Sequence, residues 1–268
     1  LLSYIWSHKN SAMNWRIAVI PVTMIPIIII IIQFDIKLDD VFAIGVVPFI
    51  AAILAMMVKL GLQGLKLSYI ARSFLGNFDS IKRLAAMRIG SEVIKFTTPM
   101  FVGAEFVVIY YMTKKGISPS KASWVALLDI VTEVFAGGLL SILAGIFALL
   151  NGAYVVAALI LGTSIFVTTL WVVLFFASAK HTFHLPKGIA MLLTKFGGVR
   201  GEKYARQTDE WIDEVCMMSR HNLGFSKSRT VFCVGFLMSL ASWILYGISF
   251  LVLAVSVGFT VGFLVSTM

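Results

Sequence analysis

Long apolar segments recur along this chain and are separated by short polar stretches. Two of them, Ile17–Ile32 and Val155–Ala177, approach or reach the roughly 20 residues that a helix needs to cross a hydrocarbon core of about 30 Å. Inside a bilayer the backbone must satisfy its own hydrogen bonds, so such segments fold as helices. Only 13% of the 268 residues are charged, about half the fraction of a soluble domain, and 59% are hydrophobic. The sequence therefore predicts an all-α fold, that of a polytopic helical membrane protein.

The formal net charge of +9 raises the question of nucleic-acid binding. The basic residues, however, lie in short segments between the apolar runs, a pattern that sets membrane topology and contacts anionic lipid headgroups. We therefore expect lipid headgroups as partners and no nucleic acid. No metal site and no cofactor are expected, because Cys216 and Cys233 form no ligand framework and the pair His181 and His184 has no third ligand nearby in sequence.

The first part of the chain predicts two spans, over residues 15–34 and 41–63. The loop between them is acidic, whereas the second span is followed by many basic residues and a single acid, Asp79. Because basic residues favour the cytoplasmic side, the N-terminus is expected in the cytoplasm. Residues 70–88 are only partly apolar and predict an interfacial helix that lies at the membrane surface.

The second part predicts three further spans, over residues 120–150, 153–177 and 231–257. Residues 178–230 form a long polar segment that is expected on the cytoplasmic side, and 258–268 predict the start of a further, truncated element. Apolar residues of the polar segment share one helical face, which suits an interfacial helix or a helix that caps the mouth of the bundle. They are Tyr204, Trp211, Ile212, Val215 and Met218. The whole chain, 1–268, is predicted to be one membrane domain with five to six spans.

Residues 89–112 are apolar enough to enter the membrane, yet basic residues flank them on both sides. A single crossing would place one basic flank outside, so we predict a re-entrant pair of half-helices that enters and leaves on the cytoplasmic side. Pro99 lacks a backbone N–H and Gly103 permits a bend, so the break is expected between them. The hydroxyls of Thr97 and Thr98 could satisfy backbone groups that the break frees. The alternative is an ordinary span that is kinked at Pro99.

Four acidic residues, Glu92, Glu105, Asp129 and Glu133, fall in strongly apolar surroundings. An ionised carboxylate at the bilayer centre costs about 3 kcal/mol on insertion scales, so such residues usually face a cavity or a partner. Asp129 and Glu133 are four residues apart and lie on one helical face, which makes a shared proton plausible. Glu92 and Lys95 are three apart and could neutralise each other.

Each acid also has a structural interpretation. Glu92 and Lys95 could form an ion pair at a helix end, and Asp129 or Glu133 could accept hydrogen bonds from the broken backbone. Glu105 could offset the dipole of the second half-helix. The functional interpretation is that Glu105, Asp129 and Glu133 line a polar cavity that holds a charged headgroup. The candidate substrate-binding residues are Glu105, Asp129, Glu133, Lys95, Glu92, Thr97 and Thr98.

The stretch SEVIKFTTPMFVGAEFVVIYYMTKKGISPSKASWVALLDIVTEVFAG resembles a known family. It is similar to the membrane region of lysylphosphatidylglycerol synthases and of their stand-alone, flippase-like relatives in bacteria and archaea. The resemblance covers residues 90–138. The positions that carry it are Pro99, Gly103, Glu105, Gly116, Ser118, Ala122, Asp129 and Glu133.

This resemblance implies translocation of a lipid between the leaflets of a prokaryotic plasma membrane. The lipid would be an aminoacylated phosphatidylglycerol or a lipid-linked or glycolipid substrate. Acids would engage a cationic headgroup, and Lys95 or cytoplasmic arginines would hold the phosphate. The synthase activity of the family belongs to a separate soluble domain, so no enzymatic activity is expected of this chain.

The chain departs from the family pattern at two places. Many members carry an arginine three residues after the glutamate, where this chain has Val108. If that arginine contacts a phosphate, another cation must do so here. Many members also have a second Pro-Gly-rich re-entrant element, which would begin near Met268.

The leading hypothesis is thus a flippase-like lipid transporter. One alternative is an intramembrane lipid-modifying enzyme that uses Asp129 and Glu133 as an acid–base pair. The other is an assembly or anchor subunit that binds a partner through its long polar segment. Small residues at Gly137, Gly138, Ser141 and Gly145 would allow close helix contacts within the chain or between copies in a homo-oligomer.

Overall fold

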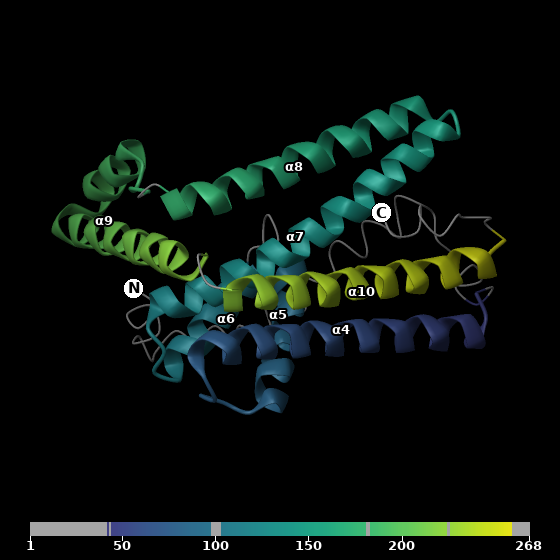
Figure 1. Ribbon diagram of the computed structural model, residues 1–268, viewed down its shortest axis with the longest axis horizontal. Helices are drawn as coiled ribbons and strands as arrows, with labels where there is room; N and C mark the ends of the chain where they lie inside the picture. Colours follow the sequence, from purple (N-terminus) through teal and green to yellow (C-terminus); the bar gives the residue numbers. More distant parts are fainter. Residues whose placement is uncertain (1–41, 43, 98–102, 181–182, 224–225, 259–268) are drawn as a thin grey trace.

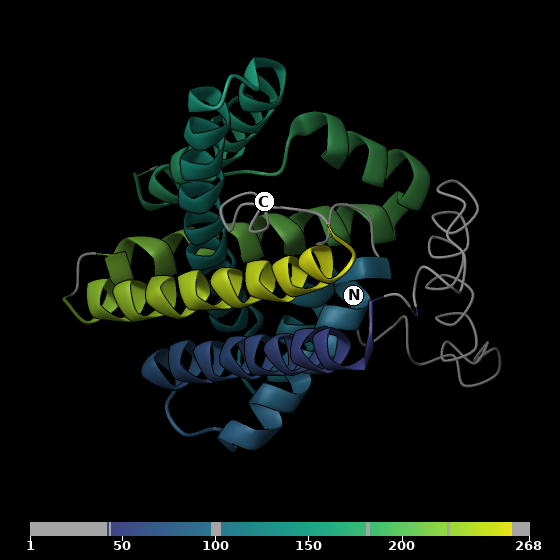
Figure 2. The same ribbon diagram turned by 90° about the vertical axis from the view of Figure 1, so that its right-hand side faces the viewer.

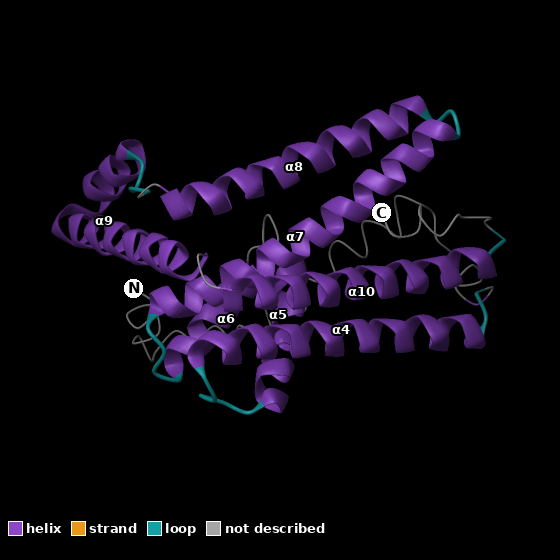
Figure 3. Cartoon of the chain, in the orientation of Figure 1, coloured by secondary structure: helices purple, strands orange, loops and turns teal. Residues whose placement is uncertain are grey.

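The computed structural model of this protein describes residues 42, 44–97, 103–180, 183–223 and 226–258. Every regular element in these ranges is an α-helix (Figure 3), so the predicted all-α fold is confirmed for this part of the chain. With the labels of Figure 1, the helices are α4 (Val46–Leu75), α5 (Ile81–Thr97), α6 (Gly103–Lys114), α7 (Pro119–Leu150), α8 (Tyr154–Lys180), α9 (Lys187–Leu223) and α10 (Ser226–Ser256). The expected span 15–34 and nearly all of the expected element 258–268 lie outside the described residues.

Four of these helices, α4, α7, α8 and α10, are long and apolar enough to cross a bilayer. Helices α7 and α8 nearly coincide with the expected spans 120–150 and 153–177, and α10 begins slightly before the expected span 231–257. Large apolar side chains on α8 are exposed, as expected of a helix that contacts lipid tails; they include Leu159, Phe166 and Val173. The chain is therefore a helical membrane protein.

Helix α4 extends beyond the expected span 41–63, and the interfacial helix expected over 70–88 does not exist as one element. Gly76 ends α4, because its φ of 73° suits glycine and its N–H donates to Arg72 O over 3.1 Å. Ser80 begins α5, because its Oγ accepts the N–H of Arg83 at 3.3 Å in the manner of an N-cap. Residues 70–75 thus complete α4 and 81–88 open α5. The prediction of one helix over 70–88 was wrong because Gly76 and Ser80 separate two helices within it, and Arg88, whose charge suggested the membrane surface, is buried.

Helices α5 and α6 form an antiparallel pair. The Tyr111 hydroxyl, near the end of α6, donates to Asp79 Oδ2 over 2.6 Å, and Lys115 Nζ lies 3.0 Å from the same oxygen. Asp79 lies two residues before the start of α5, so the end of α6 lies beside the start of α5. The residues that join the two helices, including Thr98 and Pro99, lie outside the described part of the chain.

The helices are arranged as two longer pairs around this short one. Helices α4 and α10 lie side by side and antiparallel, and the α7–α8 hairpin diverges from them toward its turn at Asn151–Gly152 (Figures 1 and 2). The end of α4, the start of α5, the end of α6 and the start of α7 meet at one end of the bundle. We call it the basic end, since it carries Arg72, Lys82, Arg83, Lys114, Lys115 and Lys121.

Helix α9 packs across the basic end, against α7 and α8 (Figure 1). It bends at Gly198, whose φ of 52° is not helical. Trp211 Nε1 donates to Ser123 Oγ on α7 at 3.2 Å, and the hydroxyls of Ser178 and Ser219 lie 2.9 Å apart. Of the two alternatives for residues 178–230, the structure favours a helix that caps the bundle.

Small residues permit the closest helix contacts. A Cβ at Gly64 of α4 would lie 2.7 Å from Ala85 Cα of α5, and one at Gly138 of α7 would collide with Thr168 Oγ1 of α8. The predicted close contacts at Gly138 and Gly145 are therefore made within the chain, to α8. The homo-oligomer stays a prediction.

The apolar core lies at the basic end, where α4, α6 and α7 meet. Trp124 is its largest buried side chain and stacks on Phe175 of α8 with ring centroids 6.1 Å apart. Leu67, Leu84, Val108 and Met112 belong to the same core. This core fixes the α5–α6 pair against the longer helices. It thereby positions the charged side chains that these helices carry.

Candidate functional site

Charged and polar side chains from four helices gather in the interior of the bundle. We call this set the charge cluster. It consists of Lys59, Gln63 and Lys66 on α4, Arg88 and Glu92 on α5, Glu105 on α6, and Asp129 and Glu133 on α7.

Arg88 lies at the centre of the charge cluster and is 0% exposed. Its Nη2 is 3.1 Å from Glu133 Oε2 and 3.3 Å from Asp129 Oδ2. The same nitrogen is 3.2 Å from Glu92 Oε1, while Nη1 is 3.6 Å from Glu105 Oε1. The planar guanidinium presents several donors in fixed directions, so one side chain contacts carboxylates on three helices.

Lys66 is the second buried cation, at 1% exposure. Its Nζ lies 3.0 Å from Asp129 Oδ1 and 3.7 Å from Glu133 Oε2. It also donates to Asp129 O and to Ser239 Oγ, each at 3.1 Å. Lys66 therefore ties α4 to both α7 and α10.

The other members lie toward the edge of the charge cluster. Glu133 also accepts a hydrogen bond from Gln63 Nε2 at 3.3 Å, and Lys59 Nζ lies 3.8 Å from Glu92 Oε2. Glu105 stands in the first turn of α6, where a negative charge offsets the helix dipole, and it remains 8% exposed.

The cations balance carboxylates that would otherwise repel one another in a region of low dielectric constant. Arg88 Nη2 contacts both Asp129 and Glu133, so these two neighbouring carboxylates share a cation. Removing one partner from such a buried network leaves a charge without compensation, which is strongly destabilising. The charge cluster therefore holds α4, α5, α6 and α7 in one arrangement.

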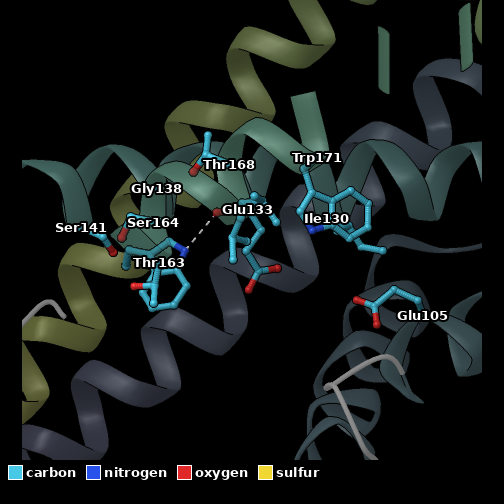
Figure 4. Close-up of a pocket in the computed structure, with 13 residues that line it drawn as sticks. Glu105, Ile130, Glu133, Gly138, Ser141, Thr163, Ser164, Thr168 and Trp171 are labelled. Atoms are coloured by element: carbon cyan, nitrogen blue, oxygen red, sulfur yellow. Dashed lines mark hydrogen bonds between the residues drawn. The ribbon is translucent and has the colours of Figure 1, made fainter. Parts of the chain in front are cut away.

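Two cavities adjoin the charge cluster. The first, the inner cavity, has a volume of about 510 Å³ and lies among α7, α8 and α10 beside Glu105 and Glu133 (Figure 4). Gly138, Ser141, Thr163 and Thr168 line its far part, and Trp243 donates a hydrogen bond from Nε1 to Glu133 O at 3.3 Å. The second, the α9 cavity, has a volume of about 420 Å³ and extends to Trp211, Ile212 and Val215 of α9.

The two cavities share Glu105, Ile130 and Trp171 in their walls. These residues come from α6, α7 and α8, so the two cavities are neighbours along α7 with α6 and α8 beside them; we refer to the two cavities together as the groove. Phe106, which lines the α9 cavity, is 59% exposed, so the groove reaches the outer surface of the bundle. In Figure 4 the carboxylates of Glu105 and Glu133 turn toward each other across the groove.

The family model described as Lysylphosphatidylglycerol synthase TM region matches residues 20–268. The chain belongs to this family. No curated protein and no solved structure matches it significantly. The match confirms the resemblance seen in residues 90–138 and extends it over nearly the whole chain. Together with its four apolar helices, it indicates a membrane protein connected with lipid modification or transport.

In this member of the lysylphosphatidylglycerol synthase membrane family, the four acids singled out from the sequence come together. Glu92, Glu105, Asp129 and Glu133 all contact Arg88. Lys95 and Thr97 belong to the last turn of α5, but their side chains are not among the described ones. Thr98 and Pro99 are outside the described residues, and Gly103 is the first residue of α6.

Sequence reasoning missed the cations of the charge cluster. Arg88 and Lys66 are among the basic residues that follow the second predicted span and were expected on the cytoplasmic side, yet both are buried. A signal was present: Lys59, Gln63 and Lys66 are spaced by four and three residues, which places them on one face of an otherwise apolar helix. Arg88 and Glu92, four residues apart, gave the same signal on α5.

The family position where many members carry an arginine is also explained by packing. Val108 is buried in the apolar core at 1% exposure. A guanidinium nevertheless lies beside the family's glutamate, since Arg88 of α5 contacts Glu105. The cation next to Glu105 thus comes from a neighbouring helix.

Asp79 joins the ends of the short helix pair outside the charge cluster. The hydrogen bond from Tyr111 and the ammonium of Lys115 hold the pKa of Asp79 well below its ordinary value. Its Oδ1 also accepts the N–H of Ser80 at 2.7 Å, and its carbonyl accepts from Arg72 Nη2 at 3.0 Å. Asp79 therefore fixes the α5–α6 pair to the end of α4.

Proposed function

We propose that this protein is a flippase-like transporter that moves a phospholipid, or a lipid-linked polar headgroup, between the leaflets of the cell membrane. The observation that carries the proposal is the groove formed by the inner cavity and the α9 cavity. It combines two carboxylates at Glu105 and Glu133 with long apolar walls, and it reaches the outer surface of the bundle.

The shape and chemistry of the groove suit a lipid. An acyl chain would lie against apolar residues such as Ile130, Val167 and Leu174. A cationic headgroup, such as that of an aminoacylated phosphatidylglycerol, would approach Glu105. Glu105 Oε1 lies 3.6 Å from Arg88 Nη1, and Glu105 is 8% exposed whereas Asp129 is 2% exposed, so a second cation can reach Glu105 more easily than Asp129.

We infer further that α5 and α6 are re-entrant half-helices. Their outer ends meet at Asp79, Tyr111 and Lys115, between the end of α4 and the start of α7. This arrangement favours entry and exit on one side of the membrane over a kinked span. The basic end would face the cytoplasm. Broken helices that meet beside a charged cavity at membrane depth are the usual setting of transporter substrate sites.

A transporter fits the charge cluster better than an intramembrane enzyme. Asp129 contacts both Lys66 and Arg88, and Glu133 contacts the same two cations. Such paired carboxylates are suited to fixed electrostatic roles, whereas an acid–base pair must exchange protons readily. We therefore propose that this chain carries out no lipid chemistry itself.

The test is lipid translocation in proteoliposomes. Labelled cationic, zwitterionic and anionic phospholipids are compared for the unaltered protein, for Glu105→Gln and for Glu210→Gln. Glu210 is an exposed residue of α9 whose side chain lies 3.6 Å from Arg206, so it serves as the matched control. We expect movement of the cationic lipid, a decrease of about tenfold or more in Glu105→Gln, the scale of one charge-assisted hydrogen bond, and no change in Glu210→Gln.

Three outcomes would contradict the proposal. Translocation of no lipid by folded protein would favour the enzyme or the assembly subunit. Equal movement of every lipid class would show that the carboxylates do not select a cationic headgroup. An unchanged rate in Glu105→Gln would place the pathway elsewhere.

A further inference from the structure

A third cavity, of about 440 Å³, lies on the side of α4 and α10 near the basic end, away from the charge cluster residues. Its walls come from α4, from the first residue of α5 and from α10. We call it the α4–α10 groove. It is lined by Leu65, Ser68, Tyr69, Arg72, Ser73, Ile81, Val234 and Met238.

Arg72 is the charged residue of this lining. Within the described part of the chain its guanidinium makes one hydrogen bond, from Nη2 to the Asp79 carbonyl, and contacts no carboxylate. Its Nε is enclosed and lacks an acceptor there. The carboxylate of Asp79 is instead engaged by Tyr111, Lys115 and Arg83. Arg72 is thus a half-buried cation to which the described residues offer a carbonyl dipole but no carboxylate contact.

A cation beside apolar walls is costly without an opposite charge. The walls of the groove are apolar at Leu65, Ile81, Val234 and Met238, and Leu65 and Ile81 are exposed. An occupant that complements both features carries one negative charge and one long apolar chain. The occupant would also lie near the level of the lipid headgroups, since the exposed residues Lys82 and Arg83 of the basic end directly follow Ile81 in the chain.

We propose that the α4–α10 groove binds an anionic glycerophospholipid. Its phosphate accepts hydrogen bonds from Arg72, and one acyl chain lies along Leu65, Val234 and Met238. The hydroxyl of Tyr69, which has no hydrogen bond to any described residue, provides a further donor. This lipid site is separate from the transport groove, because the two share no lining residue.

The occupant has a structural consequence. The Arg72 guanidinium donates a hydrogen bond to the Asp79 carbonyl. The Asp79 carboxylate, just before α5, accepts a hydrogen bond from Tyr111 near the end of α6. A phosphate on Arg72 therefore sits one residue away from the junction that fixes the short helix pair. Binding of an anionic lipid at this site would therefore stabilise the junction between α5 and α6.

The experiment counts lipids retained by the full chain in mild detergent by native mass spectrometry, together with melting temperatures. Phosphatidylglycerol, phosphatidylcholine of the same chains, and inorganic phosphate are added in turn. The variants are Arg72→Gln, Arg72→Lys and Met238→Trp, which fills the apolar part of the groove. The matched controls are Arg220→Gln and Met217→Trp, both at exposed positions of α9.

We expect the unaltered protein to retain phosphatidylglycerol in preference to phosphatidylcholine and to melt at a higher temperature with it. Arg72→Gln and Met238→Trp should each bind one phosphatidylglycerol fewer, with an affinity about tenfold or more lower. Arg72→Lys should keep most of the binding, and the controls should be unchanged.

Equal retention of phosphatidylglycerol and phosphatidylcholine would overturn the proposal, as would full binding in Met238→Trp. If inorganic phosphate alone raised the melting temperature as much as the lipid did, the site would belong to a free anion instead. Because the transport assay uses a different groove and Glu105, it can fail while this binding persists, or the reverse.

Discussion

Arg88 offers the sharpest test of the charge cluster as the support of this fold. Its guanidinium is fully buried and lies within 3.6 Å of four carboxylates. Arg88→Gln keeps much of the side-chain volume and removes the charge. The variant leaves those carboxylates with Lys66 and Lys59 as their described cations. Loss of one partner from a buried ion pair costs about 3–5 kcal/mol.

For a chain of this length, that loss corresponds to a fall of roughly 10 °C in melting temperature. The measurement is thermal unfolding of the detergent-solubilised protein, with Arg83→Gln as the matched control. Among the described residues the Arg83 guanidinium pairs with Asp79, at 3.5 Å, and its side chain is 70% exposed, so its loss should cost at most about 1 kcal/mol.

A second substitution tests the cause. Glu92→Gln, added to Arg88→Gln, removes one of the carboxylates left in excess and should restore part of the lost stability. If Arg88→Gln melts like Arg83→Gln, or if Glu92→Gln lowers the melting temperature further, the charge cluster does not hold the helices as argued.

Three further predictions concern other parts of the fold. Gly138→Val should cost about 1–3 kcal/mol because its side chain collides with Thr168 of α8, and Thr168→Ala should recover part of this in melting experiments. Gly162→Val, at a helical glycine with open space around it, is the control. Because Tyr111 and Lys115 lower the pKa of Asp79, its carboxylate stabilises the folded state above the ordinary aspartate pKa of about 4, and this contribution is lost as the pH falls through and below that value. The stability difference between the unaltered protein and Asp79→Asn should thus be constant at neutral pH and shrink below about pH 4; a difference that grows on acidification would contradict the assigned role. Trp211→Phe should weaken the docking of α9 by about 1 kcal/mol through loss of the bond to Ser123, seen as roughly fivefold faster amide exchange in α9, whereas Tyr204→Phe should leave exchange unchanged.

The sequence predicted the broad fold because apolar length and charge placement are local properties of the chain. Helices α7 and α8 lie nearly where expected, since the Asn151–Gly152 turn and Pro119 mark their ends plainly. The boundary between α4 and α5 was misplaced, because Gly76 and Ser80 were weaker signals than the polarity of residues 70–88. Part of that polarity comes from Arg88, which is buried inside the bundle.

The candidate site was predicted only by its acids. Glu105, Asp129 and Glu133 stood out because each is an isolated charge among apolar residues. Arg88 and Lys66 did not, because positive charges near helix ends are usual at the cytoplasmic face of a membrane protein. Their true partners lie on other helices, 45 and 63 residues away for Arg88–Glu133 and Lys66–Asp129, and such pairing depends on tertiary contacts.

The central claim is that the groove between α6 and α8 holds a lipid whose headgroup lies near Glu105. The most direct measurement uses a cationic phospholipid with a photoactivatable group on one acyl chain, cross-linked to the protein in proteoliposomes and mapped by peptide mass spectrometry. We predict adducts on residues that line the groove, chiefly Ile130, Trp171 and Leu174, and their loss in Glu105→Gln. Adducts confined to the exposed outer face of α8, at Leu159 and Phe166, would contradict the claim.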